Sequence, residues 1–371
     1  MAGIYVHIPF CKSRCIYCGF YSTTATDQRQ RYVDALCREW EMRQAELASD
    51  AAIETLYLGG GTPSQLTTPQ LEQLMKTVPR ASQETTIECN PDDVTSSFAS
   101  FLPRLGIDRV SMGAQTFDDE RLSFLHRRHT AIQVSQAVEH LRQAGIGNIS
   151  IDLMYGFPGE TLSDWQRDID QALALNVEHI SAYCLMVEEG TPLYERLQRK
   201  EQSETTRMPD EEQERRMYET LIDRLTEAGY EHYEISNFAR PGYRSRHNGS
   251  YWNDVPYIGL GAAAHSYDRQ RRQWNVSDIR RYMEAIEQGV IPCESELLDD
   301  DTRYNDRITT AMRTSDGLDL ATLSQRHRSY CLKEAQPYID DGLLRMEGSH
   351  LIITRRGLFV SDMVMSSLML V

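Results

Sequence analysis

The sequence predicts an α/β protein in which a partial, open (β/α)6 barrel of the TIM-like kind is followed by a smaller α+β domain. Six short apolar, β-branched runs alternate with helical patterns through the first half of the chain. Strands that alternate with helices of ten or more residues form βαβ units and a parallel sheet. Six units are fewer than the eight of a closed barrel, so we expect an open one. After residue 300 the pattern changes to helices followed by a hairpin, which is typical of a winged-helix-like module.

The strands of the barrel are predicted at regular intervals along the chain. Their ranges are Gly3–Pro9, Thr55–Gly59, Thr86–Cys89, Arg109–Gly113, Ile149–Tyr155 and His179–Met186. Apolar residues at helical spacing lie between them, for example at Tyr32, Leu36 and Trp40. Thr68 and Pro69 have the pattern of an N-cap followed by a proline at the first helical position.

The predicted domain limits are 1–240 for the barrel, 241–300 for a connecting segment and 301–371 for the C-terminal domain. In the last of these, helices are predicted at Arg303–Met312, Leu320–His327 and Cys331–Asp340, a hairpin at Leu343–Met346 and Leu351–Thr354, and a last helix near Arg356. A winged helix suggests DNA binding, but residues 301–371 contain nine basic and nine acidic residues, whereas DNA-reading surfaces are basic. We therefore expect an interaction or lid role.

The overall charge excludes several classes of partner. The 39 Lys and Arg residues against 55 Asp and Glu give a net charge of −16, which argues against a nucleic-acid or anionic-membrane surface as the main partner. No apolar stretch approaches the roughly 18 residues of a membrane span. Three of the eight cysteines are clustered, a pattern of metal binding in a reducing compartment. We expect a cytoplasmic protein without a membrane span, whose membrane association would at most be peripheral.

The three clustered cysteines, Cys11, Cys15 and Cys18, directly follow the first predicted strand. Thiolates hold iron–sulfur clusters, and three ligands leave one iron of a [4Fe–4S] cluster open to a small molecule. The alternative is a zinc site, which needs further protein ligands, and His7 is the nearest candidate. The C-x3-C-x2-C spacing resembles the radical S-adenosylmethionine (SAM) superfamily, where the amine and carboxylate of SAM chelate the open iron.

Polar or glycine-rich motifs also follow the ends of the next four strands, at the end of the barrel where parallel strands place their site. Glycines at 59–61 let the backbone approach a ligand closely. Carboxylate or amide groups of Glu88, Gln115 and Asp152 suit ribose hydroxyls and polar edges. Arg127 can pair with the methionyl carboxylate of SAM, and the Tyr17 ring can pack near the adenine. Taken singly, each is more often an ordinary turn or surface charge.

Several whole motifs are similar to the family of the oxygen-independent coproporphyrinogen III dehydrogenase, and within it to the HemW heme-chaperone branch. They span residues 5–11, 59–64, 88–91, 111–117 and 151–159. The resemblance implies a [4Fe–4S] cluster and SAM. The cluster and SAM positions that carry over are Tyr5, Cys11, Cys15, Tyr17, Cys18, Gly60, Gly61, Thr62, Glu88, Gln115, Arg127, Asp152 and Met186.

One departure separates the two branches. The dehydrogenase carries a further cysteine two residues after the third cysteine of the motif. This chain has Phe20 at that position, and the chaperone branch also has an aromatic residue there. The segment 247–252 also has the H-N-x-x-Y-W pattern of the chaperone branch. That resemblance implies heme as ligand, His247 as its axial ligand with His265 second, and heme-acceptor proteins as partners, among them respiratory enzymes. The alternative is a radical SAM enzyme that oxidatively decarboxylates coproporphyrinogen III.

Overall fold

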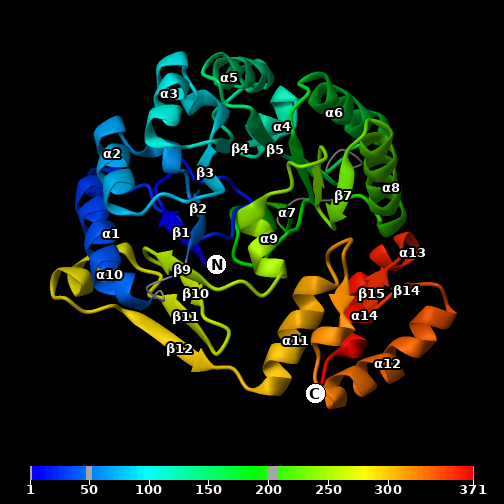
Figure 1. Ribbon diagram of the computed structural model, residues 1–371. Helices are drawn as coiled ribbons and strands as arrows, with labels where there is room; N and C mark the ends of the chain where they lie inside the picture. Colours follow the sequence, from blue (N-terminus) through cyan, green and yellow to red (C-terminus); the bar gives the residue numbers. More distant parts are fainter. Residues whose placement is uncertain (1, 47–51, 199–206, 371) are drawn as a thin grey trace.

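Six parallel strands form the centre of the molecule and surround its interior (Figure 1). The computed structural model describes residues 2–46, 52–198 and 207–370. The six strands predicted from the sequence are present, in the order predicted. They are β1 (Ala2–Ile8), β2 (Ile53–Gly60), β3 (Glu84–Cys89), β4 (Arg109–Gln115), β5 (Asn148–Tyr155) and β6 (His179–Cys184). Strands β1 and β6 do not pair with each other, so the barrel is open, and the predicted fold class is confirmed.

Alternation along the strands separates an apolar outer face from a polar interior. On β1, Ile4, Val6 and Ile8 are fully buried in the main core between the sheet and the helices. The intervening Tyr5 and His7 belong to the opposite face, because successive side chains of a strand point to opposite sides. The registers continue this polar face across the sheet by pairing Tyr5 with Tyr57, Glu88 with Ser111 and Asp152 with Ser181.

Helices cover the outer face of these strands (Figure 1). They follow the strands as α1 (Arg29–Arg43), α2 (Thr68–Thr77), α3 (Ser96–Phe101), α4 (Asp119–Phe124), α5 (Ala131–Gln143), α6 (Leu162–Ala174), α7 (Pro192–Gln198) and α8 (Glu211–Glu227). Capping boxes begin α2, α5, α6 and α8, each with a Thr or Asp before the first turn. The predicted N-cap of the second helix lies one residue earlier, at Thr67.

The sheet continues beyond the barrel on both sides to a total of 12 strands. Next to β6 lie β8 (Asn237–Ala239) and β7 (Glu231–Glu234); next to β1 lie β9 (Tyr257–Leu260), β10 (His265–Tyr267), β11 (Arg271–Asn275) and β12 (Cys293–Leu297). Helices α9 (Arg246–Trp252) and α10 (Ile279–Glu287) belong to the same stretch of chain. Much of the predicted connecting segment thus extends the barrel sheet, and the limits 1–240, 241–300 and 301–371 stay predictions.

The C-terminal part has a core of its own. It contains α11 (Asp300–Ala311), β13 (Leu318–Asp319), α12 (Gln325–Asp340), β14 (Leu344–Glu347), β15 (His350–Ile353), α13 (Arg355–Leu358) and α14 (Ser361–Leu368). The predicted hairpin is present as β14 and β15. The predicted helix Leu320–His327 is wrong: residues 320–322 form a short 3-10 turn, and Ser324 caps one continuous helix, α12.

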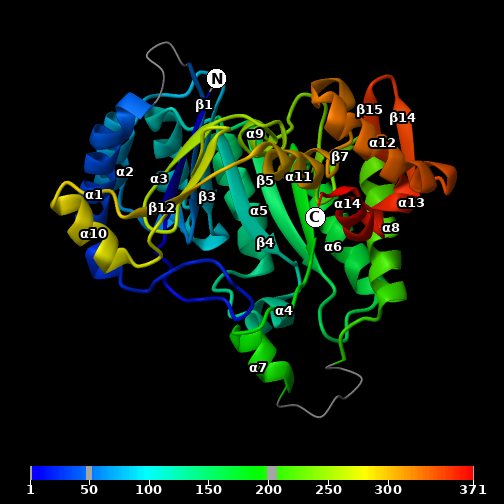
Figure 2. The ribbon, with the colours of Figure 1, turned by 90° about the horizontal axis from the view of Figure 1, so that it is seen from below.

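The two ends of the barrel are occupied by different elements. Helices α4 and α7 lie at the end where β1 leads into the cysteines, whereas α9 and α11 lie at the opposite end (Figure 2). None of the described helices is both long and apolar enough to cross a bilayer.

Candidate functional site

The cysteine loop, residues 11–18, is held at the carboxyl end of the strands by a small apolar cluster. Ile16 in this loop is buried with Leu125, Met154, Phe157 and Leu193, which come from three other segments of the chain. Its backbone N–H donates to the carbonyl of Leu125 (3.2 Å), and its carbonyl accepts from the N–H of Leu193 (2.9 Å). The loop therefore rests on buried contacts, while the three cysteines beside Ile16 are partly exposed and free of disulfides.

Arg127 joins the cysteine loop to two strand ends. Its Nη1 lies 3.6 Å from Sγ of Cys15, and its Nη2 donates to Oδ1 of Asn90 (2.8 Å) and to the carbonyl of Gly113 (2.6 Å). The Nε of Arg127 is buried and has no partner. A buried, unpaired guanidinium N–H is costly, so this side chain is suited to an anionic ligand.

The glycines at 59–61 have a packing role. A Cβ on Gly59 would come within 2.7 Å of the Tyr57 ring, and one on Gly61 within 2.6 Å of the backbone of Pro9. Gly60 has φ +110, and a Cβ there would lie 2.5 Å from the His7 ring. Protein atoms therefore fill the positions where the Cβ atoms of these glycines would lie. Access of a ligand to their backbone stays a prediction. Thr62, which follows, places its Oγ1 3.5 Å from Sγ of Cys11.

Glu88 holds the turn after β2. One carboxylate oxygen accepts from the Gly60 N–H (2.9 Å) and the other from the Tyr57 hydroxyl (2.8 Å). Burial raises the pKa of Glu88 to about 7, although both hydrogen bonds oppose that shift. Each carboxylate oxygen of Glu88 has a second lone pair, so it can still accept a hydrogen bond from a ligand hydroxyl.

Gln115 closes β4 in an unusual conformation. Its φ is +68, a value that residues other than glycine rarely adopt. The side chain folds back over Gly113, where an added Cβ would lie 2.6 Å from Nε2 of Gln115 and 3.1 Å from Nη2 of Arg127. Strain of this kind is frequent at functional sites, and here it brings the amide of Gln115 beside Arg127.

Asp152 lies deeper in the barrel interior. Burial raises its pKa to about 6, while hydrogen bonds with Ser181 and Ser111 and the charge of Arg109 act in the opposite direction. Tyr5 is also interior, and its hydroxyl is 3.0 Å from Nδ1 of His7. Met186, by contrast, follows β6 and has an exposure of 68%.

The thiols fit a multi-iron cluster better than a single ion. Burial raises the pKa of Cys11 and of Cys18, so both thiols are protonated until a metal displaces the proton. Burial likewise raises the pKa of Tyr17 between the cysteines. In the described part of the chain, no three His, Cys, Asp or Glu side chains are placed to share one metal ion. A [4Fe–4S] cluster distributes its ligands over separate irons, so it does not require such convergence.

The two proposed heme ligands, His247 and His265, lie on α9 and β10, outside the cysteine loop. His247 is part of α9, which lies at the opposite end of the barrel from α4 and α7 (Figure 2), and it is fully buried. Its Nδ1 is 2.8 Å from Oγ1 of Thr55 and its Nε2 is 2.8 Å from the hydroxyl of Tyr251. Both ring nitrogens are thus engaged, and an iron bond would require one contact to break. His265, on β10, is exposed and lies beside Trp274.

Two site residues had no role assigned from the sequence. In the sequence, Asn90 is only one member of the motif 88–91 at the end of the third predicted strand. In the structure, its Oδ1 accepts a hydrogen bond from Nη2 of Arg127. Arg109 is 1% exposed, and its Nε and Nη1 have no partner. Arg109 begins β4 on the same face as Ser111, so strand alternation could have placed it in the interior. Its charge reaches both Glu88 and Asp152 and favours their ionised forms.

Comparison with known proteins places this site in a class. Residues 5–172 match the radical SAM superfamily, and residues 298–360 match the HemN C-terminal domain. The structure also aligns with that of the coproporphyrinogen III oxidase HemN from Escherichia coli, with a TM-score of 0.83 and 24% identity, covering 99% of this chain and 89% of that one. At this identity the likeness shows the fold. The chain is thus a radical SAM protein in its domain content and architecture.

Sequence relatives narrow the class to one family. The heme chaperone HemW of Mycobacterium tuberculosis is 34% identical over 99% of this chain and 94% of its own length. HemW of Bacillus subtilis is 37% identical, covering 79% of this chain and 78% of its own. The chain belongs to the HemW family, as its motifs indicated.

Proposed function

We propose that the protein is a heme chaperone that binds heme and a SAM-chelated [4Fe–4S] cluster and transfers heme to acceptor proteins. The observation that supports the cluster part best is the convergence of the cysteine loop with Arg127, whose Nη1 is 3.6 Å from Cys15 and whose Nε is buried without a partner. The heme part is supported by the printed names of the HemW relatives.

Each residue of the loop region has a part in this proposal. Cys11, Cys15 and Cys18 would ligate three irons, and the fourth iron would offer its open position to the amine and carboxylate of SAM. Arg127 would bind the carboxylate. The remaining SAM contacts, several of them through the backbone, are assigned to Tyr5, Tyr17, Gly60, Gly61, Thr62, Glu88, Gln115, Asp152 and Met186.

The proposed cargo is heme, and the proposed acceptors are heme proteins. Respiratory enzymes are the first class of acceptor to test. The chaperone itself is expected in the cytoplasm. His247 stays the proposed axial ligand. In this structure its ring is bonded to Thr55 and Tyr251, so binding through it requires a change at α9.

Hemin titration tests the cargo assignment. Wild-type protein is expected to shift the Soret band of hemin at a one-to-one ratio, and His247→Ala to alter that spectrum because imidazole is a strong heme-iron ligand. His265→Ala tests the second candidate, and His350→Ala, on the C-terminal hairpin, is the matched control. An unshifted Soret band with wild-type protein would overturn the heme assignment.

A separate assay distinguishes a chaperone from an enzyme. Anaerobically reconstituted protein supplied with SAM, a reductant and coproporphyrinogen III is expected to leave the porphyrinogen unchanged, since Phe20 stands where the dehydrogenase branch has a cysteine. Formation of protoporphyrinogen would replace the chaperone proposal by the decarboxylase alternative.

A further inference from the structure

The chain directly after α11 packs against the end of strand β7 in the barrel sheet. The carbonyl of Arg313 accepts from the N–H of Ile235 (3.1 Å), and the N–H of Ser315 donates to the carbonyl of Tyr233 (3.0 Å). The guanidinium of Arg313 also pairs with the carboxylate of Glu234, with Nε at 2.9 Å and Nη2 at 2.8 Å from the same oxygen, Oε1. The C-terminal part thus places a cation on a buried carboxylate of the barrel sheet.

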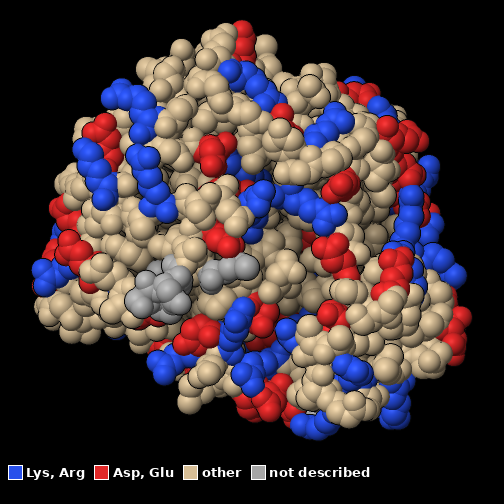
Figure 3. Space-filling model, viewed as in Figure 1, with Lys and Arg blue, Asp and Glu red and all other residues tan. Residues whose placement is uncertain are grey.

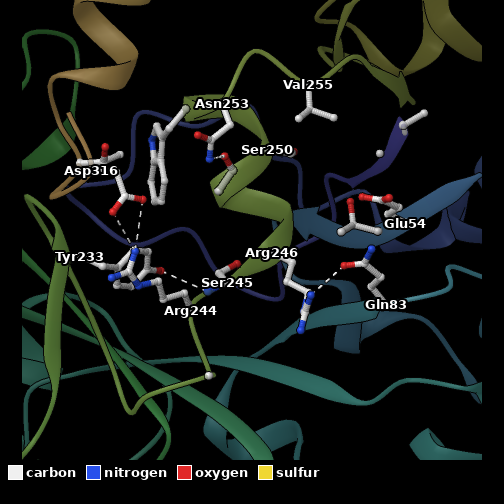
Figure 4. Close-up of a pocket in the computed structure, with 17 residues that line it drawn as sticks. Glu54, Gln83, Tyr233, Arg244, Ser245, Arg246, Ser250, Asn253, Val255 and Asp316 are labelled. Carbon is white, nitrogen blue, oxygen red and sulfur yellow. Dashed lines mark hydrogen bonds and ion pairs between the residues drawn. The ribbon is translucent and has the colours of Figure 1, made fainter. Parts of the chain in front are cut away.

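Two other ion pairs across this boundary are exposed. Arg355 pairs with Asp223 of α8 (2.5 Å), and Arg244 pairs with Asp316 (3.4 Å), whose side chain is 67% exposed. Basic and acidic side chains lie close together on this face of the molecule (Figure 3), and exposed pairs contribute little to stability. A pocket of about 390 Å³, lined by α9 and by Asp316, also opens at the boundary (Figure 4). The contact of Glu234 differs from these, because its carboxylate is 1% exposed.

Glu234 begins a chain of hydrogen bonds that crosses the sheet toward Asp152. Oε2 of Glu234 accepts from Nδ2 of Asn237 (2.5 Å), and Oδ1 of Asn237 accepts from the hydroxyl of Ser181 (2.9 Å). Ser181 is the register partner of Asp152, and its hydroxyl is within hydrogen-bonding reach of that carboxyl as well. Three buried side chains therefore link Arg313 to Asp152, one of the proposed SAM contacts.

The chemistry of the donors fixes the direction of this chain. An ionised carboxylate only accepts hydrogen bonds, so Asn237 has to turn its NH2 group to Glu234 and its carbonyl oxygen to Ser181. The Ser181 hydroxyl has one proton, so it cannot donate to Asn237 and to Asp152 at the same time. While Ser181 donates to Asn237, the carboxyl oxygens of Asp152 stay free to accept from the hydroxyl groups of a ligand.

Arg313 stabilises this arrangement because it supplies the positive charge beside Glu234. A buried carboxylate that has lost its cation tends to take up a proton, and a protonated carboxyl can donate a hydrogen bond. The amide of Asn237 is then free to turn over, which removes the acceptor of Ser181. The Ser181 hydroxyl would donate to Asp152 instead, where it competes with a ligand hydroxyl.

We propose that the C-terminal part positions Asp152 for SAM through Glu234, Asn237 and Ser181, with Arg313 as the positioning residue. The inference rests on the SAM part of the proposed function and adds its regulation by the C-terminal part. Because coupling between two sites is reciprocal, SAM binding should in turn stabilise the packing of the C-terminal part against β7.

The SAM affinity of the full-length, cluster-reconstituted protein, measured by equilibrium dialysis, tests the inference. We expect Arg313→Gln to weaken SAM binding about fivefold, the equivalent of one ordinary hydrogen bond, and Arg313→Lys, which keeps the cation, to retain most of the affinity. Arg355→Gln is the matched control with wild-type affinity, since it removes an ion pair across the same boundary that does not involve Glu234. In a Ser181→Ala background, Arg313→Gln should have no further effect, because the competing hydroxyl is absent.

Hydrogen exchange at the backbone N–H groups of Ile235 and Ser315 measures the reciprocal effect. SAM should slow the exchange of both groups in the wild type and leave it unchanged in Ser181→Ala, because the chain is interrupted there.

The possible contrary results are distinct from one another. Equal SAM affinity in the wild type and Arg313→Gln would overturn the inference while SAM binding itself stands. An equal loss in Arg355→Gln would also overturn it, because any loosening of the C-terminal part would then suffice. Additive losses from Ser181→Ala and Arg313→Gln would show that the two residues act independently. Absence of SAM binding by the wild type would instead contradict the proposed function.

Discussion

Arg127 is the side chain on which the cysteine site depends most. Arg127→Met removes the cation beside Cys15 and the buried, unpartnered Nε. We expect the SAM affinity of reconstituted protein to fall at least about tenfold, because a charge-assisted pair with the carboxylate is lost. Equilibrium dialysis with labelled SAM measures this. Arg104→Met, an exposed arginine near Phe101, is the control, and equal SAM affinity in the two variants would show that Arg127 does not bind the ligand.

Glu88 makes the stability of the fold depend on pH. Burial raises the pKa of Glu88 from 4.5 to about 7, so between these values the native carboxyl holds a proton that the unfolded chain has released. The free energy of unfolding should therefore fall as the pH rises from about 4.5 to about 7, by on the order of 3 kcal/mol from this group. Asp152, with its pKa raised to about 6, adds to the fall at the acidic end of that range.

Urea unfolding of the apo-protein at pH 5, 6, 7 and 8 measures the effect. In Glu88→Gln the dependence on pH should be smaller, since the amide does not titrate. If the free energy of unfolding depends on pH equally in the wild type and in Glu88→Gln, titrating groups other than Glu88 cause that dependence.

At the scale of residues, the sequence indicated which residues come together at the cysteine loop, but it did not indicate how their side chains are oriented. Cys11 and Cys15 follow β1, Thr62 follows β2 and Arg127 follows β4, and these residues converge because parallel strands end on one edge. The fold-back of Gln115 at φ +68 could not be predicted, because it depends on the neighbouring strand and on Gly113.

At the scale of elements, the barrel strands were predictable and the flanking strands were not. Strands β1 to β6 have apolar residues at alternating positions because the helices bury one face of the sheet. Strand β12, in contrast, is exposed at every residue and contains Glu294 and Glu296, so it lacks an apolar alternation. Strand β9 pairs with β1 across about 250 residues of sequence, from Gly3 to Tyr257, and local patterns do not reveal such a partner.

Glu39 of α1 attaches these flanking elements to the barrel. The fully buried carboxylate accepts from the Tyr282 hydroxyl (2.6 Å), the Asn275 amide (2.7 Å) and the Gly261 N–H (2.8 Å), and it pairs with Arg43 (3.3 Å). Helix α10, β11 and the turn after β9 are thus held by one side chain.

We expect Glu39→Ala to lower the free energy of unfolding by about 3 to 5 kcal/mol, because buried donors and a buried guanidinium lose their acceptor. Chemical denaturation compares it with Glu41→Ala, an exposed position on the same helix, which should change stability by less than about 0.5 kcal/mol. Similar losses in the two variants would show that the network contributes little.

At the scale of the whole molecule, the cysteine loop and helix α9 lie at opposite ends of the barrel (Figure 2). The cysteine loop lies at the carboxyl end of the strands, and α9 with its pocket lies at the amino end beside the C-terminal part. Arg313 connects that part to the barrel by pairing with the buried Glu234 on β7 (2.8 Å). The sequence contains both the cysteine motif at 11–18 and the motif at 247–252, but only the fold shows that these two motifs lie at opposite ends of the barrel.

The metal and sulfide content of anaerobically reconstituted protein, read together with its reduced EPR spectrum, tests the central claim most directly. We predict about four irons and four sulfides per chain and a spectrum that changes when SAM is added. The iron and sulfide content and the SAM-dependent spectrum should be lost in each of the variants Cys11→Ser, Cys15→Ser and Cys18→Ser. They should be kept in Cys293→Ser, which changes an exposed cysteine. Zinc in place of iron and sulfide, or a cluster spectrum indifferent to SAM, would contradict the account.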